Sequence, residues 1–468
     1  MFQKALLKDA DVEVLADGVL KVLEKVGIVC QNREILEALD KAGARVDYAS
    51  ETATFPSRMT RAFVEQVRKE SPGPEPSPKF SPPSLPGLGT QVAQFFYDYE
   101  KKERRRGNRR DFIELIKLGE TLHPEHSVGH SLLLTDVPPM LEPLEAALLL
   151  AEHSRKPAPA FAWHVCQADY LMEMGEILGR PKWFSYGANC FAHPLRFDKD
   201  VADRFARRVK WGDSAGLAAM PVVGVSTPVT VAGFAVVTSA ELVAAWLAGR
   251  ALNPHVGLGG SIWGGSMDMK TGEVSYCAFD AMLFAFATSE FMRRWTGKMI
   301  PVGGGEYCDA REPGYYAALE KAYKAMTIAA FQGRHPSIGQ GLLEEGKTLA
   351  PVQLLLEREF SVGAQVLGRT APVTPENVAL DTILDVRFGL TKSYLDTDHT
   401  LQNYRQWLWC PQFMDRSGWA FEKEEVVLKR LQGKVNELVA RYEKPEVDPD
   451  KLAKMRKVVE RAKKDLLT

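Results

Sequence analysis

The stretch "HVGLGGSIWG" at residues 255–264, followed by "SYCAFDAMLFAFATSEFMRRWTG" at residues 275–297, shows the pattern that decides the fold class. The first segment is short, rich in glycine and β-prone, which predicts a strand. The second segment is long and apolar and predicts a buried helix. Alternation of strands with helices is typical of α/β proteins with parallel strands.

The same strand–helix unit repeats on both sides of this stretch, from Ser127 to Trp409. Eight segments are the strand candidates: VGHSLLLTD (128–136), APAFAWHV (158–165), KWFSYGANC (182–190), AGLAAMPVVGVS (215–226), HVGLGGSIWG (255–264), MIPVGGGEYCD (299–309), PSIGQGLL (336–343) and VRFGLTKSYLD (386–396). Eight units over about 300 residues predict a (β/α)8 TIM barrel. The rival is a doubly wound open sheet, but no GxGxxG run connects a strand to a helix.

The flanking regions have a different texture. We expect residues 1–110 to form an N-terminal helical extension that ends in a proline-rich connection, without periodicity, from Pro72 to Gly89. Residues 111–420 contain the barrel, and residues 421–468 form charged C-terminal helices that pack on its outside.

Charge and cysteine content exclude several classes of function. The formal net charge is -1, which argues against binding to nucleic acid or to an anionic membrane. The basic run "KKERRRGNRR" (101–110) is expected to be a solvated loop. Six scattered cysteines without a CxxC pair or a secretory leader predict a cytoplasmic protein. The uncharged stretch 214–240 contains two prolines and is expected to be strand, loop and buried helix rather than a membrane span.

Polar and aromatic residues collect where the predicted strands end. The last strand runs into "KSYLDTDHTLQNYR" (392–405), and in a (β/α)8 barrel the active site lies at these carboxyl ends. The candidate substrate-binding residues are Tyr97, Trp163, His164, Asn189, Trp263, Tyr307, Arg311, Gln340 and Tyr394. Because this set is rich in aromatic, amide and hydroxyl groups and poor in acids, it suits an organic cation better than a hydrolytic metal.

Other interpretations of these residues stay open. Trp163 and Trp263 are often packing residues, His399 can cap a helix, and Arg311 can pair with a neighbouring carboxylate. A zinc site would need the cysteines near strand ends, Cys166 beside His164, Cys190 near His193 and Cys308 after Tyr307, to converge in space. The glycines of "VGGGE" (302–306) lack a nucleotide-loop pattern and are expected to let a large group approach the backbone.

Several ordered blocks resemble the trimethylamine methyltransferase family. They are "STPVTVAGFAVVTSAELVAAWLAGRALNP" (226–254), "MDMKTGEVSYCAFDAML" (267–283), "GGEYCDAREPGYYAALEKA" (304–322), "SYLDTDHTLQNYR" (393–405) and "PQFMDR" (411–416). The family often has lysine where Arg311 stands, and its histidine-phenylalanine-arginine run is Asn403-Tyr404-Arg405 here. These departures affect the substrate more than the fold.

The resemblance implies a TIM barrel that moves a methyl group from a methylated amine to the cobalt of a corrinoid held by a separate protein. Asp396 and His399 would then face the docked corrinoid. Since every residue is a standard one, the chain is similar to the branch without pyrrolysine, which acts on quaternary amines such as glycine betaine. The resemblance identifies no catalytic side chain and no bound metal, and we expect a homo-oligomer.

Two other functions remain as alternatives. A zinc-dependent corrinoid methyltransferase for methanol or a thiol would share the barrel but would need converging metal ligands. A non-catalytic betaine-binding protein would keep the barrel without the reaction.

Overall fold

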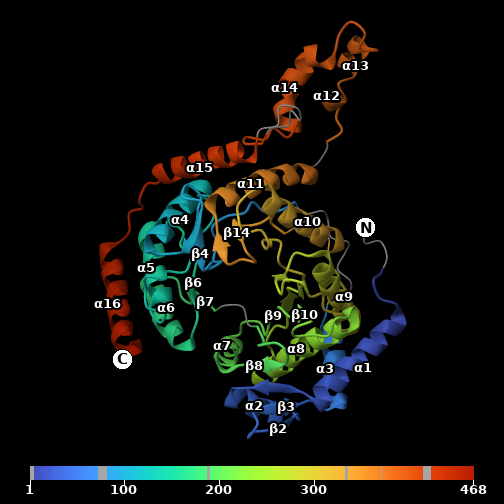
Figure 1. Ribbon diagram of the computed structural model, residues 1–468, viewed down its shortest axis with the longest axis vertical. Coiled ribbons are helices and arrows are strands. Elements are labelled where there is room, and N and C mark those ends of the chain that lie inside the picture. Colours follow the sequence, from blue (N-terminus) through green and yellow to red (C-terminus); the bar gives the residue numbers. More distant parts are fainter. Residues whose placement is uncertain are drawn as a thin grey trace.

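A computed structural model describes residues 5–71, 82–186, 190–332, 336–369, 372–414 and 423–467. Figure 1 shows a ring of helices around short strands, with an N-terminal unit at one side, two C-terminal helices along the outside and an arm that projects from the ring. The candidate residue Asn189 and residues 72–81 of the proline-rich connection lie outside the described residues.

The N-terminal unit contains three helices, as expected of a helical extension. They are α1 (Asp9–Lys25), α2 (Arg33–Lys41) and α3 (Ser57–Glu70), and they pack with β1 (Ile28–Cys30), β2 (Arg45–Asp47) and β3 (Thr52–Thr54). β1 also pairs in parallel with β8 (Arg196–Phe197), with Val29 opposite Arg196. The N-terminal unit is therefore joined to the central region by backbone hydrogen bonds.

The central region alternates strands and helices as predicted. Its strands are β4 (Phe95–Asp98), β5 (Glu103–Arg106), β6 (Ala160–Ala162), β7 (Phe184–Tyr186), β9 (Leu217–Ala219), β10 (Val222–Val223), β11 (Gly260–Ile262), β12 (Gly265–Met267), β13 (Val274–Ser275), β14 (Leu342–Leu343) and β15 (Thr348–Leu349). Its helices are α4 (Arg109–Leu122), α5 (Glu142–His153), α6 (Val165–Ile177), α7 (Lys199–Lys210), α8 (Val231–Leu252), α9 (Phe279–Thr296), α10 (Tyr315–Gln332) and α11 (Pro351–Gln365). Figure 1 shows α4 to α11 arranged around the strands.

The described strands form five small sheets, none of which closes into a barrel. Parallel pairing joins β6 to β7, β9 to β11, and β15 to β4. Isolated parallel bridges add Ala93 to Leu132, Val128 to Pro157 and Ile262 to Val302. The fold is thus α/β with parallel neighbours, and the strands are too short to form one continuous sheet.

The predicted eighth strand, residues 386–396, is wrong. The chain there ends helix α13 (Leu380–Val386), turns, and forms a 3-10 helix at Tyr394–Asp396 before α14 (Asp398–Trp407). Ser393 and Asp396 form a capping box, and the hydroxyl of Thr397 accepts a hydrogen bond from the backbone N–H of Thr400. Two helix-start signals in succession therefore prevail over the β-prone residues before them.

The basic run 101–110 is also not simply a solvated loop. Residues Glu103–Arg106 form β5, which pairs antiparallel with β4 from Phe95–Arg106 to Asp98–Glu103. Arg104 and Arg105 lie over the rings of Phe95 and Phe96, so the charged side chains cover apolar ones on this hairpin.

The C-terminal helices confirm the expectation for residues 421–468. α15 (Glu424–Ala440) packs on α11 and α4, and α16 (Pro449–Leu466) packs on α5 and α6. Of the helices in the described ranges, α8 alone has the length and apolar composition to cross a membrane, and 72% of that apolar window is buried inside the protein. The uncharged stretch 214–240 contains β9, β10 and the start of α8, as predicted.

An ion pair in the interior fixes α10 against α11. Lys321 and Glu357 are both fully buried, and the Lys321 ammonium donates to Glu357 and to the carbonyl of Leu342. Glu357 also accepts from the backbone N–H of Gly341 at 2.6 Å and from Gln353 at 2.9 Å. A buried pair of this kind is held by its full set of partners rather than by attraction alone.

We expect Lys321→Met to destabilise the protein by about 3–5 kcal/mol, because it leaves the Glu357 carboxylate buried without its cation. The double variant Lys321→Met/Glu357→Met should lose less than the sum of the two single changes. Urea unfolding followed by circular dichroism measures the free energies. The control is Arg33→Met, which breaks the exposed pair with Glu37 and should cost at most about 0.5 kcal/mol. If Lys321→Met and Arg33→Met lowered the free energy of unfolding by the same amount, the buried ion pair would not be more important for stability than the exposed one.

Candidate functional site

The candidate site lies where three loops meet beside the strands β11 and β14. Trp263 follows β11, Tyr276 and Cys277 precede α9, and Glu306 to Asp309 follow the bridge at Val302. Lys324 reaches the same place from α10, and Glu345 from the turn after β14. We call these side chains the aromatic–carboxylate cluster: Trp263, Tyr276, Cys277, Glu306, Tyr307, Asp309, Lys324 and Glu345.

Three aromatic rings form one side of the cluster. The ring centroids of Trp263 and Tyr307 are 5.1 Å apart and those of Tyr276 and Tyr307 are 5.9 Å apart, with tilted and edge-on geometry. The indole N–H of Trp263 donates to the hydroxyl of Ser261 at 2.7 Å, which holds the ring in place. The arrangement offers aromatic faces from three separate loops, the kind of surface that attracts an organic cation.

The glycines of the 302–306 segment allow this close packing, as expected from the sequence. A β-carbon on Gly303 would lie 2.5 Å from the Trp263 ring, and one on Gly304 would lie 2.5 Å from the ammonium nitrogen of Lys324. Gly304 also has a φ of +93°, a conformation that favours glycine. The large group that approaches the backbone is therefore the indole of Trp263.

Carboxyl groups and a thiol form the other side. The ligand atoms of Cys277, Asp309 and Glu345 lie within 4.8 Å of one another. The backbone N–H of Tyr276 donates to Glu345 at 3.1 Å, and Glu320 accepts from the backbone N–H groups of Asp309 and Ala310 at 3.0 and 3.1 Å. These bonds fix the two loops that carry the acids.

Burial controls the charge of this side. Removal from water, together with the neighbouring Asp309, raises the pKa of Glu345 to about 9, so this carboxyl is protonated at neutral pH. Burial also lowers the pKa of Lys324 and raises the pKa of Cys277 to about 12. The protonated Glu345 thus lies beside Asp309, and Cys277 is a neutral thiol.

The alternative zinc arrangement, which needs the cysteines near strand ends to converge, does not form among the described residues. The Sγ of Cys166 lies 2.9 Å from the Nδ1 of His164 without a further ligand, while His193 is paired with Glu241 at 2.8 Å. Cys308 faces the carbonyl of Leu342 at 3.6 Å. Within the described ranges, Cys277, Asp309 and Glu345 are the one group of three or more metal-ligating residues that converges.

The structure brings together two of the residues expected from the sequence, Trp263 and Tyr307. Arg311 lies on the same loop as Tyr307, but its side chain is 68% exposed and donates to Glu273 at 2.8 Å. Arg311 thus forms a salt bridge, as its alternative interpretation expects. Its partner is Glu273 rather than one of the carboxylates near it in sequence, Asp309 and Glu312.

Trp163 and His164 lie together at the start of α6. The Trp163 indole packs on Phe161 and donates to Glu142 at 3.2 Å. His164 is the N-cap of α6, where its Nδ1 accepts from the backbone N–H of Cys166 at 3.3 Å. No hydrogen bond or ring contact found in the described part of the chain joins these two side chains to the cluster. Trp163 packs on Phe161, as the packing interpretation expects, and His164 caps α6 with a side chain that is 40% exposed. A role of either residue in substrate binding stays a prediction.

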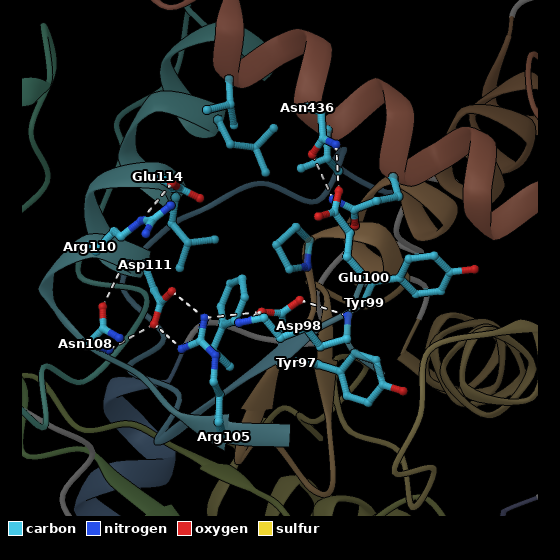
Figure 2. A pocket seen from close by; sticks show the side chains of 18 of the residues that line it. Tyr97, Asp98, Tyr99, Glu100, Arg105, Asn108, Arg110, Asp111, Glu114 and Asn436 are labelled. Atoms are coloured by element: carbon cyan, nitrogen blue, oxygen red, sulfur yellow. Dashed lines mark hydrogen bonds and ion pairs between the residues drawn. The ribbon is translucent and has the colours of Figure 1, made fainter. Parts of the chain in front are cut away.

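Tyr97 lines a separate cavity of about 710 Å³ between the β4–β5 hairpin, α4 and α15. Figure 2 shows polar side chains of this cavity bonded to one another. Arg105 pairs with Asp111 at 2.6 and 2.7 Å, and the amide of Asn436 donates to Glu100 at 2.9 Å. Gln340 lines another cavity, of about 330 Å³, where it accepts a hydrogen bond from Gln91.

The remaining candidates are on the projecting arm. Tyr394, Asp396 and His399 belong to the 3-10 helix and α14, which Figure 1 places away from the ring. Asp396 accepts from the backbone N–H of Ser393 at 3.0 Å and so stabilises the local turn.

Sequence reasoning missed Tyr276, Lys324 and Glu345 as site residues. Tyr276 stands immediately before the apolar helix α9, and Lys324 interrupts the apolar face of α10. A lysine at a position where helical periodicity expects a buried apolar residue was the available signal.

Comparisons with known proteins agree on one family. A sequence profile of the trimethylamine methyltransferase (MTTB) family matches residues 2–466. The chain is 22% identical to a glycine betaine methyltransferase of Desulfitobacterium hafniense, over 98% of each chain. It is 25% identical to the trimethylamine methyltransferase MttB2 of Methanosarcina mazei over 58% of this chain and 54% of that relative. A trimethylamine methyltransferase MttB of D. hafniense is 22% identical over 86% of this chain and 82% of its own length.

We expect Glu345→Gln to flatten the pH dependence of stability. The pKa of Glu345 rises from 4.5 to about 9 in the folded protein, so the folded state holds this proton more tightly than the unfolded state. Its contribution is complete below pH 4.5 and is lost as the pH rises towards 9. The amide cannot titrate, so the free energy of unfolding should fall less steeply across this range.

The measurement is urea unfolding at several pH values. The control is Glu425→Gln, which changes an exposed carboxylate on α15 and should keep the slope of the parent. A parental slope in Glu345→Gln would show that this carboxyl does not hold its proton in the folded state.

Proposed function

The chain belongs to the trimethylamine methyltransferase (MTTB) family and is a methyltransferase, and we propose that it moves a methyl group from a quaternary amine resembling glycine betaine to the Co(I) of a corrinoid on a separate protein. The similarity to a glycine betaine methyltransferase over nearly the full length of both chains supports this substrate class. The trimethylamine methyltransferases among the relatives support a methylated amine more generally.

The observation that carries the proposal is the aromatic–carboxylate cluster. Trp263, Tyr276 and Tyr307 offer ring faces to a quaternary ammonium, which cannot donate a hydrogen bond and is bound by such faces. Asp309, which is exposed, adds negative charge at the edge of the cluster. Burial raises the pKa of Glu306 and Glu345 and lowers that of Lys324, so it disfavours the charged form of each of these three side chains.

The reaction needs little from the protein beyond binding. In the transfer the methyl–nitrogen bond breaks and its electron pair stays on the nitrogen, which leaves as a neutral tertiary amine. The methyl carbon is bonded instead to cobalt, which supplies the new electron pair from Co(I). The protein would orient one methyl group towards the corrinoid and exclude water, and both are effects of proximity.

The proposed frame for this chemistry is the (β/α)8 barrel. Parallel pairing joins β6 to β7, β9 to β11 and β15 to β4, and isolated parallel bridges join Ala93 to Leu132, Val128 to Pro157 and Ile262 to Val302. This pairing supports a ring of strands in which β15 replaces the predicted eighth strand. The cluster would then occupy one mouth of the ring, where barrel enzymes have their sites.

A zinc-dependent methyltransferase is the second candidate, because Cys277, Asp309 and Glu345 converge. Zinc binds the thiolate, and burial raises the pKa of Cys277 to about 12, so the metal would have to displace a firmly held proton. Stoichiometric zinc in purified protein, with activity lost on chelation, would favour this alternative over the quaternary amine.

We expect Trp263→Ala to raise the KM for glycine betaine about 2- to 30-fold, because one cation–π contact is worth roughly 0.5–2 kcal/mol. Trp163→Ala should change it less than about twofold, since Trp163 contacts Phe161 and Glu142 instead. The measurement is methylation of cob(I)alamin against substrate concentration. If both substitutions raised the KM equally, the wider ring of residues expected from the sequence would bind the substrate. If the parent protein transferred no methyl group to cob(I)alamin, the proposed reaction would be wrong.

We propose that Arg311 receives the carboxylate of a betaine in exchange for Glu273. Their pair is exposed on both sides, so it holds Arg311 weakly. Arg311→Ala should therefore raise the KM for glycine betaine about 2- to 10-fold, the reduced value of a charge-assisted bond at an exposed site. Choline, which lacks the carboxylate, should be unaffected.

Glu273→Gln is the matched test of the exchange. It removes the competitor of the substrate and should lower the KM for glycine betaine. If Arg311→Ala acts equally on choline and on glycine betaine, Arg311 does not bind the carboxylate.

A further inference from the structure

The imidazole of His164 lies between a thiol and a carboxylate at the start of α6. The Sγ of Cys166 is 2.9 Å from Nδ1 of His164, and Nε2 of the same ring is 3.7 Å from Oδ1 of Asp200. His164 is the N-cap of α6 and Cys166 is its second residue, whereas Asp200 lies in the first turn of α7. The packing of α6 against α7 therefore assembles the three side chains.

The hydrogen bonds of His164 decide which ring nitrogen carries the proton. A backbone N–H can only donate, and that of Cys166 lies 3.3 Å from Nδ1, so Nδ1 is an acceptor. The proton of the neutral ring is therefore on Nε2, which faces Asp200. The thiol can then donate its S–H to Nδ1. In this arrangement a histidine takes the proton of a nucleophile and a carboxylate favours the charged ring.

The surroundings of Cys166 do not make it a permanent thiolate. Burial raises the pKa of the Cys166 thiol, and the carboxylate of Asp169 adds to this effect, although a backbone N–H lowers it. Asp169 is paired with Arg207 of α7, which also donates to the carbonyl of Val165 at 3.0 Å. The thiol therefore depends on His164 to remove its proton when it reacts.

Two further features favour the anion once the proton has moved. Cys166 lies at the N-terminus of a helix of 13 residues, where the positive end of the helix dipole stabilises a thiolate. Tyr170, one turn further along α6, donates its hydroxyl to Asp465 of α16 at 2.7 Å, so this carboxylate is directed at the phenol.

No other cysteine has this environment. Burial raises the pKa of Cys30, Cys277 and Cys308 to about 12 and that of Cys190 to about 11. In the hydrogen bonds found among the described residues, Cys166 is the one cysteine within reach of a histidine nitrogen. Cys166 is also partly exposed, and the side chain of His164 beside it is 40% exposed, so a small molecule can reach the sulfur.

We propose that Cys166 is a site of oxidation by hydrogen peroxide or another small hydroperoxide, with His164 as its base. Nδ1 of His164 takes the thiol proton, and the sulfur attacks one oxygen of the peroxide. The O–O bond breaks, and the oxygen that leaves takes the proton from His164 and departs as water or an alcohol. The sulfur is oxidised to a sulfenic acid and the peroxide is reduced. Asp200 stabilises the imidazolium between the two proton transfers.

The parent protein gives the first test. The full chain is treated with hydrogen peroxide in the presence of dimedone, which captures sulfenic acids, and peptide mass spectrometry measures the rate of labelling at each cysteine. The exposed Cys410 is the comparator within the same molecule. At neutral pH Cys166 should react about 10-fold or more faster than Cys410, a value below the usual range for a positioned base because Cys166 is partly buried.

The pH profile separates base assistance from simple exposure. An unassisted thiol reacts about tenfold faster for each pH unit below its pKa, because the thiolate fraction rises in that proportion. The rate at Cys410 should rise in this way between about pH 6 and pH 8. The rate at Cys166 should rise less steeply, because its proton goes to His164 rather than to solvent.

His164→Asn is the decisive variant, because asparagine keeps the N-cap of α6 but removes the base. It should slow the labelling of Cys166 about 10-fold or more and give it the steep pH profile of an unassisted thiol. Asp200→Asn should slow it less, at most about fivefold, because this ion pair is exposed on both sides. The control is His255→Asn, at an exposed histidine after α8, which should change neither rate.

Three outcomes would overturn the proposal. They are labelling of Cys166 no faster than that of Cys410, equally steep pH profiles at the two sites in the parent, and an unchanged rate at Cys166 in His164→Asn. Buried Cys277 reports on folding, since its labelling in a variant would reveal unfolding, and the profile of the parent then decides. None of these measurements needs substrate or corrinoid, so failure here is distinct from failure of the proposed methyl transfer.

Discussion

The arrangement of the site depends on how two lysines of α10 are accommodated in the interior. Lys321 and Lys324 are three residues apart, so both point to the same side of the helix. Lys321 is neutralised by Glu357 and bonded to the carbonyl of Leu342, which ties α10 to α11 and to β14. Lys324 donates to the carbonyl of Tyr276 and ties α10 to the segment before α9. Removing a charge from water is costly, so each lysine requires these partners in place.

The same constraint explains why the outside of α10 is apolar. With its charged positions turned inward, the helix has only aromatic and aliphatic side chains left for its outward face, Tyr316, Leu319 and Met326. One inverted helix thus supports the scaffold through Lys321 and enters the site through Lys324.

The pattern of apolar residues along the sequence predicted the helices and most of the strands, but it placed the eighth strand wrongly. Apolar periodicity found α1 to α3, the alternating units and the C-terminal helices, because each depends on residues close in sequence. The segment 386–396 has β-prone residues, but its Ser393–Asp396 capping box starts a helix and no partner strand lies beside it. The hairpin β4–β5 was missed because its arginines look solvated, whereas they lie over Phe95 and Phe96.

Trp263 and Tyr307 follow strand-like segments and were recognisable, but Tyr276, Lys324 and Glu345 belong to the site only through contacts distant in sequence.

The polar segment 392–405 lies on the projecting arm of residues 372–414 and not at the end of a strand, so its polar side chains have a local structural role. Ser393, Thr397 and Asp396 are consumed by capping, so their chemistry serves to start two short helices where a strand was expected. Those helices hold Leu395 and Leu401 outward, where both side chains are exposed. The hydroxyls and carboxylates that suggested an active site therefore also build the arm, because they cap its two short helices.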